Sequence, residues 1–191
     1  MEKLFLPNKG SFSVFDDFIF FISMAKEKIL ILNESQILQK IRRMAYQIYE
    51  SNFQEEVIIL AGVNGAGFKL AQMLTEELGR IASFQVILTQ VRLDKKLLTQ
   101  TEVGIDIPSA ELKNRSIVLV DDVLNTGRTI AHSLPPFLNS SPKKLEIATL
   151  VNRSHKLFPI ASDFTGYELS TTLTDHIEVT LEEGQMTAYL K

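Results

Sequence analysis

Short apolar runs alternate along this chain with longer segments in which apolar residues recur at every third or fourth position. The runs are rich in valine and isoleucine and too short for helices, which predicts strands buried on both faces of a parallel sheet. The predicted strands cover 29–32, 57–61, 84–91, 117–120 and 145–151.

The periodic segments predict amphipathic helices between these strands. Residues 34–52 form the clearest one, preceded by an asparagine that has a glutamine three residues later, as in a capping box. A second helix follows the glycine-rich turn after the 57–61 strand. A third, over 130–138, contains Pro135 and Pro136, so we expect it to be limited to about two turns or to be kinked. Alternating strands and helices predict one α/β domain with a mainly parallel sheet between helices.

The amino-terminal segment breaks this pattern. Six phenylalanines lie within the first 21 residues, and the apolar run 18–23 is too short to span a bilayer. A signal peptide is not expected either, because Asp16 and Asp17 directly precede this run. We therefore expect an atypical extension over 1–25, either upstream of a natural start at Met24 or folded as a small amphipathic arm. The domain would then occupy 26–191.

Composition restricts the chemistry further. The net charge is −3, so nothing attracts nucleic acid to the chain as a whole. The chain has no cysteine, which excludes disulfides, thiolate catalysis and thiolate zinc sites and is compatible with a reducing cytoplasm, the expected location. His132, His155 and His176 do not have the spacing of a metal site, and each is expected to be a surface or satisfied core histidine.

The most informative stretch is 116–129, SIVLVDDVLNTGRT. An apolar strand runs into Asp121 and Asp122, and a turn rich in Asn, Thr and Gly then leads into a helix. Such a turn offers backbone N–H groups to an anion, and ligands of open α/β sheets bind at the carboxyl ends of strands. Carboxylates repel phosphate, so their natural partners are ribose hydroxyls or a bridging divalent metal. A ribose phosphate with Mg²⁺ satisfies both halves of this stretch.

This stretch closely resembles the phosphoribosyl-pyrophosphate (PRPP) motif of type I phosphoribosyltransferases. The resemblance implies that Asp121 and Asp122 hold the ribose 2- and 3-hydroxyls, contribute to catalysis and, through PRPP, hold Mg²⁺. It also implies that the following loop wraps the 5-phosphate. The residues of that loop are Leu124, Asn125, Thr126, Gly127, Arg128 and Thr129.

The glycine-rich turn after the 57–61 strand, GVNGAG, corresponds to the loop that contacts pyrophosphate in the same family. Glycines there allow backbone amides to approach a ligand or allow a strained turn. The expected pyrophosphate residues are Val63, Asn64, Gly65, Ala66 and Gly67. Where relatives carry Thr-Arg or Lys, this chain has no cation, which puts the catalytic rate in question. Arg92, Lys95 or Lys96, at the start of the segment that corresponds to the family's mobile loop, could supply the charge, and Arg92 is our candidate.

A second resemblance covers 150–166, LVNRSHKLFPIASDFTG. It is similar to a stretch of the branch that combines pyrimidine-operon attenuation with uracil phosphoribosyltransferase activity, and the strands expected at 177–181 and 186–190 fit that branch too. The resemblance implies a type I phosphoribosyltransferase fold with a small carboxyl-terminal hood, in which Asn152, Arg153 and His155 face the base. Asn152, Ser154 and Lys156 depart from the pattern of that branch. The resemblance therefore predicts the identity of the nucleobase less firmly than it predicts PRPP binding.

The resemblance implies an enzyme that transfers the phosphoribosyl group of PRPP to a nucleobase, with uracil favoured, and that forms a dimer. Two alternatives remain: a PRPP or nucleotide sensor that controls RNA with little catalysis, and a purine phosphoribosyltransferase. RNA would need a basic face, and the candidate cations are few. They are Arg42, Arg43, Lys143 and Lys144. RNA binding is therefore possible but not favoured, and no membrane association is expected.

Overall fold

The computed structural model describes residues 28–93, 103–153, 156–170 and 175–191. The expected 1–25 extension, Lys95, Lys96 and His155 lie outside these ranges. In chain order the elements are β1 (Ile29–Leu32), α2 (Glu34–Asn52), β2 (Val57–Val63), α3 (Ala66–Ile81), β3 (Gln85–Arg92), β4 (Gly104–Ile105), α4 (Ser109–Leu112), β5 (Ser116–Leu124), α5 (Arg128–Ser133), α6 (Pro135–Asn139), β6 (Lys144–Arg153), β7 (Phe164–Leu169), β8 (Ile177–Glu182) and β9 (Gln185–Leu190).

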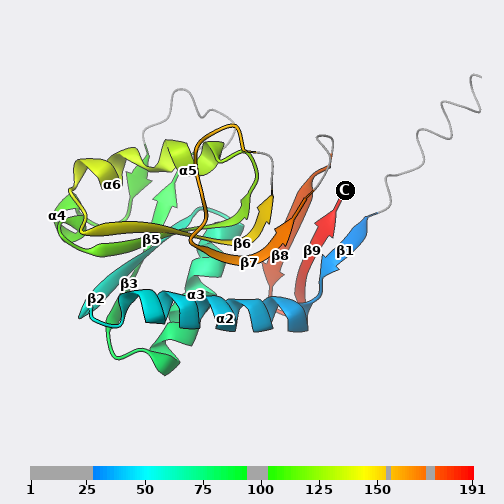
Figure 1. Ribbon diagram of the computed structural model, residues 1–191, viewed down its shortest axis with the longest axis horizontal. Helices are drawn as coiled ribbons and strands as arrows, with labels where there is room; N and C mark the ends of the chain where they lie inside the picture. Colours follow the sequence, from blue (N-terminus) through cyan, green and yellow to red (C-terminus); the bar gives the residue numbers. More distant parts are fainter. Residues whose placement is uncertain (1–27, 94–102, 154–155, 171–174) are drawn as a thin grey trace, which may run out of the picture.

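The core of the molecule is a six-stranded sheet in the order β4-β3-β2-β5-β6-β7. All neighbouring strands are parallel except β4, which is antiparallel to β3. The long helices α2 and α3 cover one face of the sheet, and the short helices α4, α5 and α6 cover the other (Figure 1). The predicted α/β architecture with a mainly parallel sheet is therefore confirmed.

The two central strands determine where the site lies. β2 and β5 are neighbours, with Gly62 opposite Val120, and both are almost entirely buried. The turn after β2 and the acidic pair of β5 therefore meet at the carboxyl edge of the sheet. The apolar run had indicated that the strand ends just before Asp121 and Asp122. β5 instead continues to Leu124, so both aspartates lie inside the strand. The strand continues because Asp121 and Val123 still pair with β6, opposite Thr149 and Val151.

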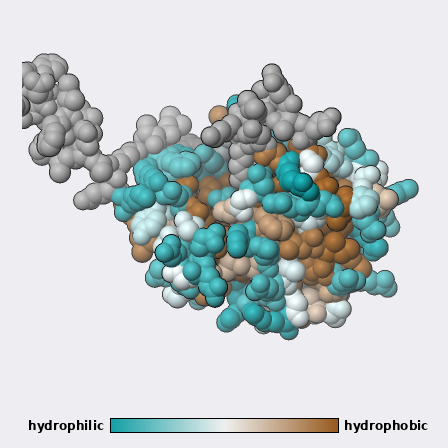
Figure 2. Space-filling model, turned by 180° about the vertical axis from the view of Figure 1, so that it is seen from behind, coloured by the Kyte–Doolittle hydropathy of each residue, from teal (hydrophilic) through white to brown (hydrophobic). Residues whose placement is uncertain are grey.

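The proline pair divides the third predicted helix, as expected. α5 ends at Ser133, and Pro135 is the first residue of α6, where its missing N–H costs no helical hydrogen bond. Each piece is only five or six residues long, so this layer of the fold is thin. Several apolar residues beneath it, including Ile87, Ile105 and Leu134, are only partly buried. Seen from behind, the molecule shows an apolar patch among polar side chains (Figure 2).

The hood is a separate antiparallel sheet in the order β1-β9-β8. From the sequence we expected the hood to be built from the carboxyl-terminal segment alone. This was wrong, because β1 from the amino-terminal part of the domain pairs with β9. β1 has only four residues, and two of them, Ile29 and Leu30, are about half exposed, so no local pattern showed which sheet it joins. No helix among the described ranges is both long and apolar enough to cross a membrane.

A surface ion-pair cluster joins the strands of the hood. Glu178 of β8 contacts Lys28, just before β1, at 3.4 Å and Lys191, just after β9, at 2.5 Å. The Lys191 ammonium, followed by Lys28, lowers the pKa of the Glu178 carboxyl below its ordinary value. A carboxyl whose folded-state pKa is lowered adds stability above its unfolded pKa and loses it as the pH falls through the folded value.

We therefore expect Glu178→Gln to be slightly less stable than the wild type at pH 7. The stability difference should disappear in acid, below the lowered pKa of Glu178, because both proteins are then neutral at this position. Urea midpoints measured between pH 7 and pH 3 test this expectation, with Glu50→Gln on the exposed face of α2 as the control. A difference that stays constant across this range would contradict it.

Candidate active site

The acidic pair lies where the central strand β5 approaches the edge of the sheet. Asp121 is buried, with 2 % of its surface exposed, whereas Asp122 is partly exposed. The backbone N–H of Asp122 donates to Oδ1 of Asp121 at 3.1 Å. A Cβ atom added at Gly67 would lie 2.9 Å from the same oxygen, so the start of α3, directly after the turn that follows β2, packs against Asp121. The pair is thus held between two loops at the carboxyl ends of the central strands.

The predicted phosphate loop encloses a cavity of about 150 Å³ between Asp121 and Ile130. Gly127 adopts a left-handed backbone with φ of 81°, which favours glycine, and a Cβ there would lie 3.1 Å from Ile160. The Thr126 hydroxyl oxygen accepts a hydrogen bond from the Arg128 N–H at 3.3 Å. This small cavity is lined by the loop of the PRPP motif, whose Asn, Thr and Arg residues have the chemistry to hold a phosphate group.

A second segment holds this loop in place. The carbonyl oxygen of Thr126 accepts hydrogen bonds from the backbone N–H groups of Leu157 and Phe158, both at 3.0 Å. The guanidinium of Arg128 lies 5.8 Å from the centre of the Phe158 ring. The two stretches that resemble the family, 116–129 and 150–166, therefore contact each other and act as one structural unit.

A larger cavity of about 310 Å³ adjoins the phosphate loop. Asp121, Val123, Asn125 and Thr129 line both cavities, so a ligand could extend from one into the other. The remaining residues that line the larger cavity are Asp122, Arg153, His176 and Ile177. The acidic pair, the predicted hood residue Arg153 and two residues at the start of β8 thus surround one space, as a ribose with its base would require.

Arg153 connects the end of β6 to the phosphate loop. It is 4 % exposed, and its Nη1 donates to Oδ1 of Asn125 at 2.9 Å. Hydrogen bonds to a charged group are among the stronger ones, so this contact fixes the Asn125 amide. Arg153 therefore supports the loop and also lines the larger cavity, and its contact with the base stays a prediction.

The sequence did not single out His176, yet it lines the larger cavity with both aspartates. Its backbone N–H and carbonyl oxygen bond to Lys191 at 2.9 and 2.8 Å, which places it at the base of the β8–β9 ladder. It had been expected to be a surface or core histidine because the three histidines lack the spacing of a metal site. Its side chain is indeed exposed, at the border of this cavity. Only the folding of the hood toward β5 brings His176 to the acidic pair.

The glycine-rich turn after β2 is tied to the end of β3. The Asn64 backbone N–H donates to the Val91 carbonyl at 2.9 Å, and the Asn64 side-chain oxygen accepts from the Leu93 N–H at 3.4 Å. Val63 is fully buried. None of the residues Val63 to Gly67 lines either of the two cavities described above. Their contact with pyrophosphate stays a prediction that rests on the position of the turn beside Asp121.

Two further predicted residues lie outside the lining of both cavities. The guanidinium of Arg92, at the end of β3, forms an ion pair with Asp106 just after β4. Asn152 donates to Glu168 at 3.5 Å, and its buried Oδ1 has no hydrogen-bond partner in the described part of the chain. The catalytic role of Arg92 and the base contact of Asn152 therefore stay predictions.

The carboxylates at this site could bind Mg²⁺ together with a substrate but not by themselves. Among the described residues there is no cluster of three or more histidine or acidic side chains that could hold a metal alone. Asp121 and Asp122 offer carboxylate oxygens beside a cavity that would hold phosphate and hydroxyl oxygens. Mg²⁺ is often bound in this way, by one or two carboxylates together with substrate phosphates.

Comparison with known proteins agrees with this geometry. Residues 30–183 match the model of the phosphoribosyl transferase domain. The chain is 35 % identical over 164 residues to the bifunctional protein PyrR of Macrococcus caseolyticus, covering 82 % of this chain and 94 % of that protein. It is 30 % identical over 168 residues to the protein of the same name from Bacillus cereus, covering 83 % and 93 %.

Solved structures show the same fold at lower identity. A hypoxanthine-guanine phosphoribosyltransferase of Bacillus anthracis matches with a TM-score of 0.66 and 19 % identity, over 87 % of this chain and 97 % of that one. The Trypanosoma cruzi hypoxanthine enzyme gives 0.64 and 15 %, over 75 % and 78 %. The match over 30–183, together with the PRPP motif around an acidic pair and a phosphate-sized cavity, shows that this chain belongs to the phosphoribosyltransferase family.

Proposed function

We propose that this protein transfers the 5-phosphoribosyl group of PRPP to a nucleobase, most readily uracil, and releases pyrophosphate. The observation that carries the proposal is the pair of adjoining cavities that share Asp121, Val123, Asn125 and Thr129. A phosphate in the smaller cavity leaves the ribose beside the carboxylates. Uracil is favoured by the resemblance of 150–166 to the pyrimidine branch of the family.

The residues of the site support a reaction by positioning. The aspartates accept hydrogen bonds from the ribose hydroxyls, and the 125–129 loop holds the 5-phosphate. A nitrogen of the base then bonds to C1 of the ribose as the bond from C1 to pyrophosphate breaks. The electron pair of that bond leaves on the pyrophosphate oxygen, and the N–H proton of the base passes to water or to the leaving pyrophosphate. Mg²⁺, when bound, would offset negative charge on PRPP. Orientation of this kind can account for a large part of a rate enhancement without a covalent nucleophile.

A release assay tests this proposal. PRPP and Mg²⁺ are incubated with the protein and with uracil, hypoxanthine, guanine or orotate separately, and pyrophosphate is measured. We expect release with uracil and much slower release with the other bases. Preferred release with hypoxanthine or guanine would instead assign the protein to the purine enzymes, whose structures share only the fold with this chain.

A weakly catalytic PRPP or nucleotide sensor that regulates pyrimidine genes through RNA is a second candidate. One observation favours it: the turn from Gly62 to Gly67 contains no cation to offset the charge of pyrophosphate. Tight PRPP binding in calorimetry, without pyrophosphate release from any base, would support the sensor. No PRPP binding at all would contradict both candidates.

The cations considered for RNA binding are engaged within the protein. Arg42 forms an ion pair with Glu77 at 3.5 Å, and Lys143 forms one with Glu55 at 2.7 Å. Lys144 contacts Glu146 at 3.1 Å and the Ser51 carbonyl oxygen at 2.9 Å. These contacts reduce the charge available to phosphates, so we still rank RNA binding below catalysis.

Arg43, the fourth of these cations, is exposed but also forms contacts within the protein. Its guanidinium donates to the carbonyl oxygens of Thr165 and Gly166 at 2.7 and 2.6 Å. The side chain reaches across from α2 because β7 is the last strand of the sheet on that side.

We also propose a homodimer acting in the cytoplasm. The resemblance to the family implies the dimer. The outer edge of β3 supports it. Within the described ranges this edge pairs with β4 only at Val91 and Arg92, and the preceding Val86, Ile87 and Leu88 are partly exposed. An open apolar edge of this kind favours pairing with another chain. The absence of cysteine is compatible with a reducing cytoplasm.

A further inference from the structure

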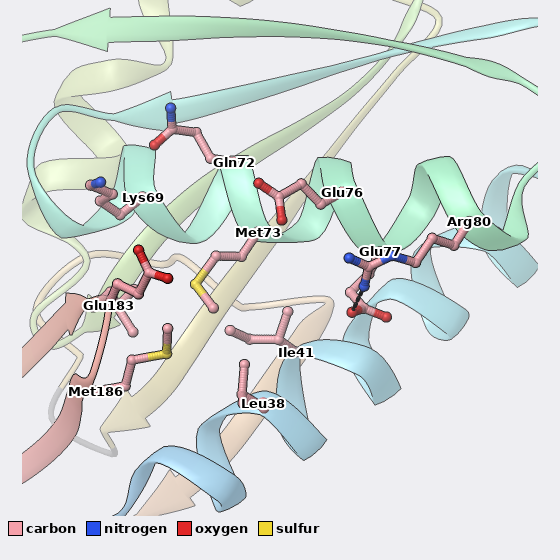
Figure 3. Close-up of a pocket in the computed structure, with 11 residues that line it drawn as sticks. Leu38, Ile41, Lys69, Gln72, Met73, Glu76, Glu77, Arg80, Glu183 and Met186 are labelled. Atoms are coloured by element: carbon pink, nitrogen blue, oxygen red, sulfur yellow. Dashed lines mark hydrogen bonds and ion pairs between the residues drawn. The ribbon is translucent and has the colours of Figure 1, made fainter.

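A groove that shares no lining residue with the substrate cavities lies between the core and the hood. It has a volume of about 500 Å³ and lies between α2, α3 and the β8–β9 hairpin (Figure 3). Its apolar wall comes from all four of these elements. We call it the α2–α3 groove and define its wall as Leu38, Ile41, Met73, Leu181 and Met186.

The wall of the α2–α3 groove is suited to receive an apolar side chain. Ile41 and Leu181 are 1 % and 5 % exposed and form a closed floor, whereas Leu38 is 43 % exposed at the rim. Met73 and Met186 are partly buried and point toward each other across the groove (Figure 3). Methionine side chains are flexible and polarisable, so they adapt to different apolar partners.

The charges around the α2–α3 groove favour a cationic partner. Glu77 already contacts both Arg42 and Arg80, and Lys69 lies 4.0 Å from Glu182. Glu76 and Glu183 also line the groove, and neither has an ion pair or hydrogen bond within the described part of the chain. These two carboxylates lie beside an apolar wall. They would complement a partner segment in which a lysine or arginine stands next to a leucine or methionine.

The elements that form the groove also reach the substrate cavity. Ile177, at the start of β8, lines the larger cavity, and Leu181, four residues later in the same strand, lines the groove. On the other side, the start of α3 packs against Asp121, and Lys69 of its first turns lines the groove. A partner in the groove would therefore contact β8 and α3, two elements that also reach the substrate site.

We propose that the α2–α3 groove is a docking site for a segment of a partner protein in which leucine or methionine is flanked by lysine or arginine. The apolar side chain occupies the space between Met73 and Met186, and the flanking cations contact Glu76 and Glu183. This inference is independent of the substrate assigned above, because it uses neither the acidic pair nor the phosphate loop.

Methionine-methyl NMR of the full chain tests the proposal. The probes are the capped peptide Lys-Leu-Leu-Lys-Leu-Lys and its charge-reversed counterpart, in which every lysine is glutamate. We expect the basic peptide to shift the methyl signals of Met73 and Met186 in a saturable manner. Met44, which is fully buried in the core, should not respond and also reports that the protein is folded. The acidic peptide should bind at least tenfold more weakly.

Two double variants with the same change in net charge separate binding at the groove from general electrostatic attraction. Glu76→Lys with Glu183→Lys is expected to weaken binding of the basic peptide at least tenfold. Glu50→Lys with Glu56→Lys changes the net charge equally outside the groove and should have little effect. The proposal is overturned if Met73 and Met186 do not respond, if both peptides or both double variants behave alike, or if these signals change with protein concentration alone, which would indicate a second copy as the occupant.

Discussion

Replacing Asp122 with Asn is expected to lower PRPP turnover by roughly a hundredfold or more, the scale of loss that a misplaced reacting group causes. Asp122 lines the larger cavity, and its carboxylate can accept hydrogen bonds from ribose hydroxyls with both oxygens. Asn keeps the shape but removes the charge and one acceptor. Pyrophosphate release at saturating base measures the effect, and calorimetry with PRPP separates lost binding from lost rate.

A stability measurement shows whether the Asp122→Asn variant is still folded. Asp122 is partly exposed, so Asn is tolerated there and the thermal unfolding midpoint should stay close to that of the wild type. Glu111→Gln, on the exposed face of α4, should leave both turnover and stability unchanged. Wild-type turnover by Asp122→Asn would remove this residue from the proposed ribose site.

Replacing Gly62 with Ala is expected to lower the free energy of unfolding by about 1–3 kcal/mol, the usual cost of overpacking a core. A Cβ atom there would lie 2.6 Å from the Cα of Phe68 and 2.8 Å from the Cβ of Ala71, so backbone or helix must move. Gly62 therefore serves the close packing of β2 against α3. Urea unfolding followed by circular dichroism measures the loss.

Gly79→Ala, in the helix α3 that packs against Gly62, provides the matched comparison. A Cβ at Gly79 meets nothing within 4 Å, and Gly79 does not need a positive φ. Alanine has the higher helix propensity, so this variant should gain up to about 1 kcal/mol. Opposite signs for the two variants would confirm the packing role of Gly62, and equal effects would contradict it.

The central part of the site could be predicted because its signals are local. An apolar strand, two carboxylates and a glycine-containing turn follow one another within 116–129, and the structure places all of them around adjoining cavities. The helix over 34–52 was equally clear, since its amphipathic period and capping box both appear in α2. These features depend on residues that are neighbours along the chain.

Other elements left no such signal. β7 was not predicted because its sequence, FTGYEL, mixes polar residues and glycine with apolar ones. It forms a strand because it pairs with β6 and because Arg43 of α2 binds its carbonyl groups. The short β4 likewise exists only through its pairing with β3.

The sequence alone determined the α/β class of this protein, its PRPP motif and the positions of its main strands along the chain, because hydrophobic period and turn chemistry act over a few residues. The tertiary structure decided that β1 joins the hood, that Arg153 supports Asn125 and that His176 reaches the acidic pair. It also decided that Glu76 of α3 and Glu183 of the hood line one groove. Each of these contacts joins segments far apart in the chain, so it depends on how the two sheets pack and not on any local preference.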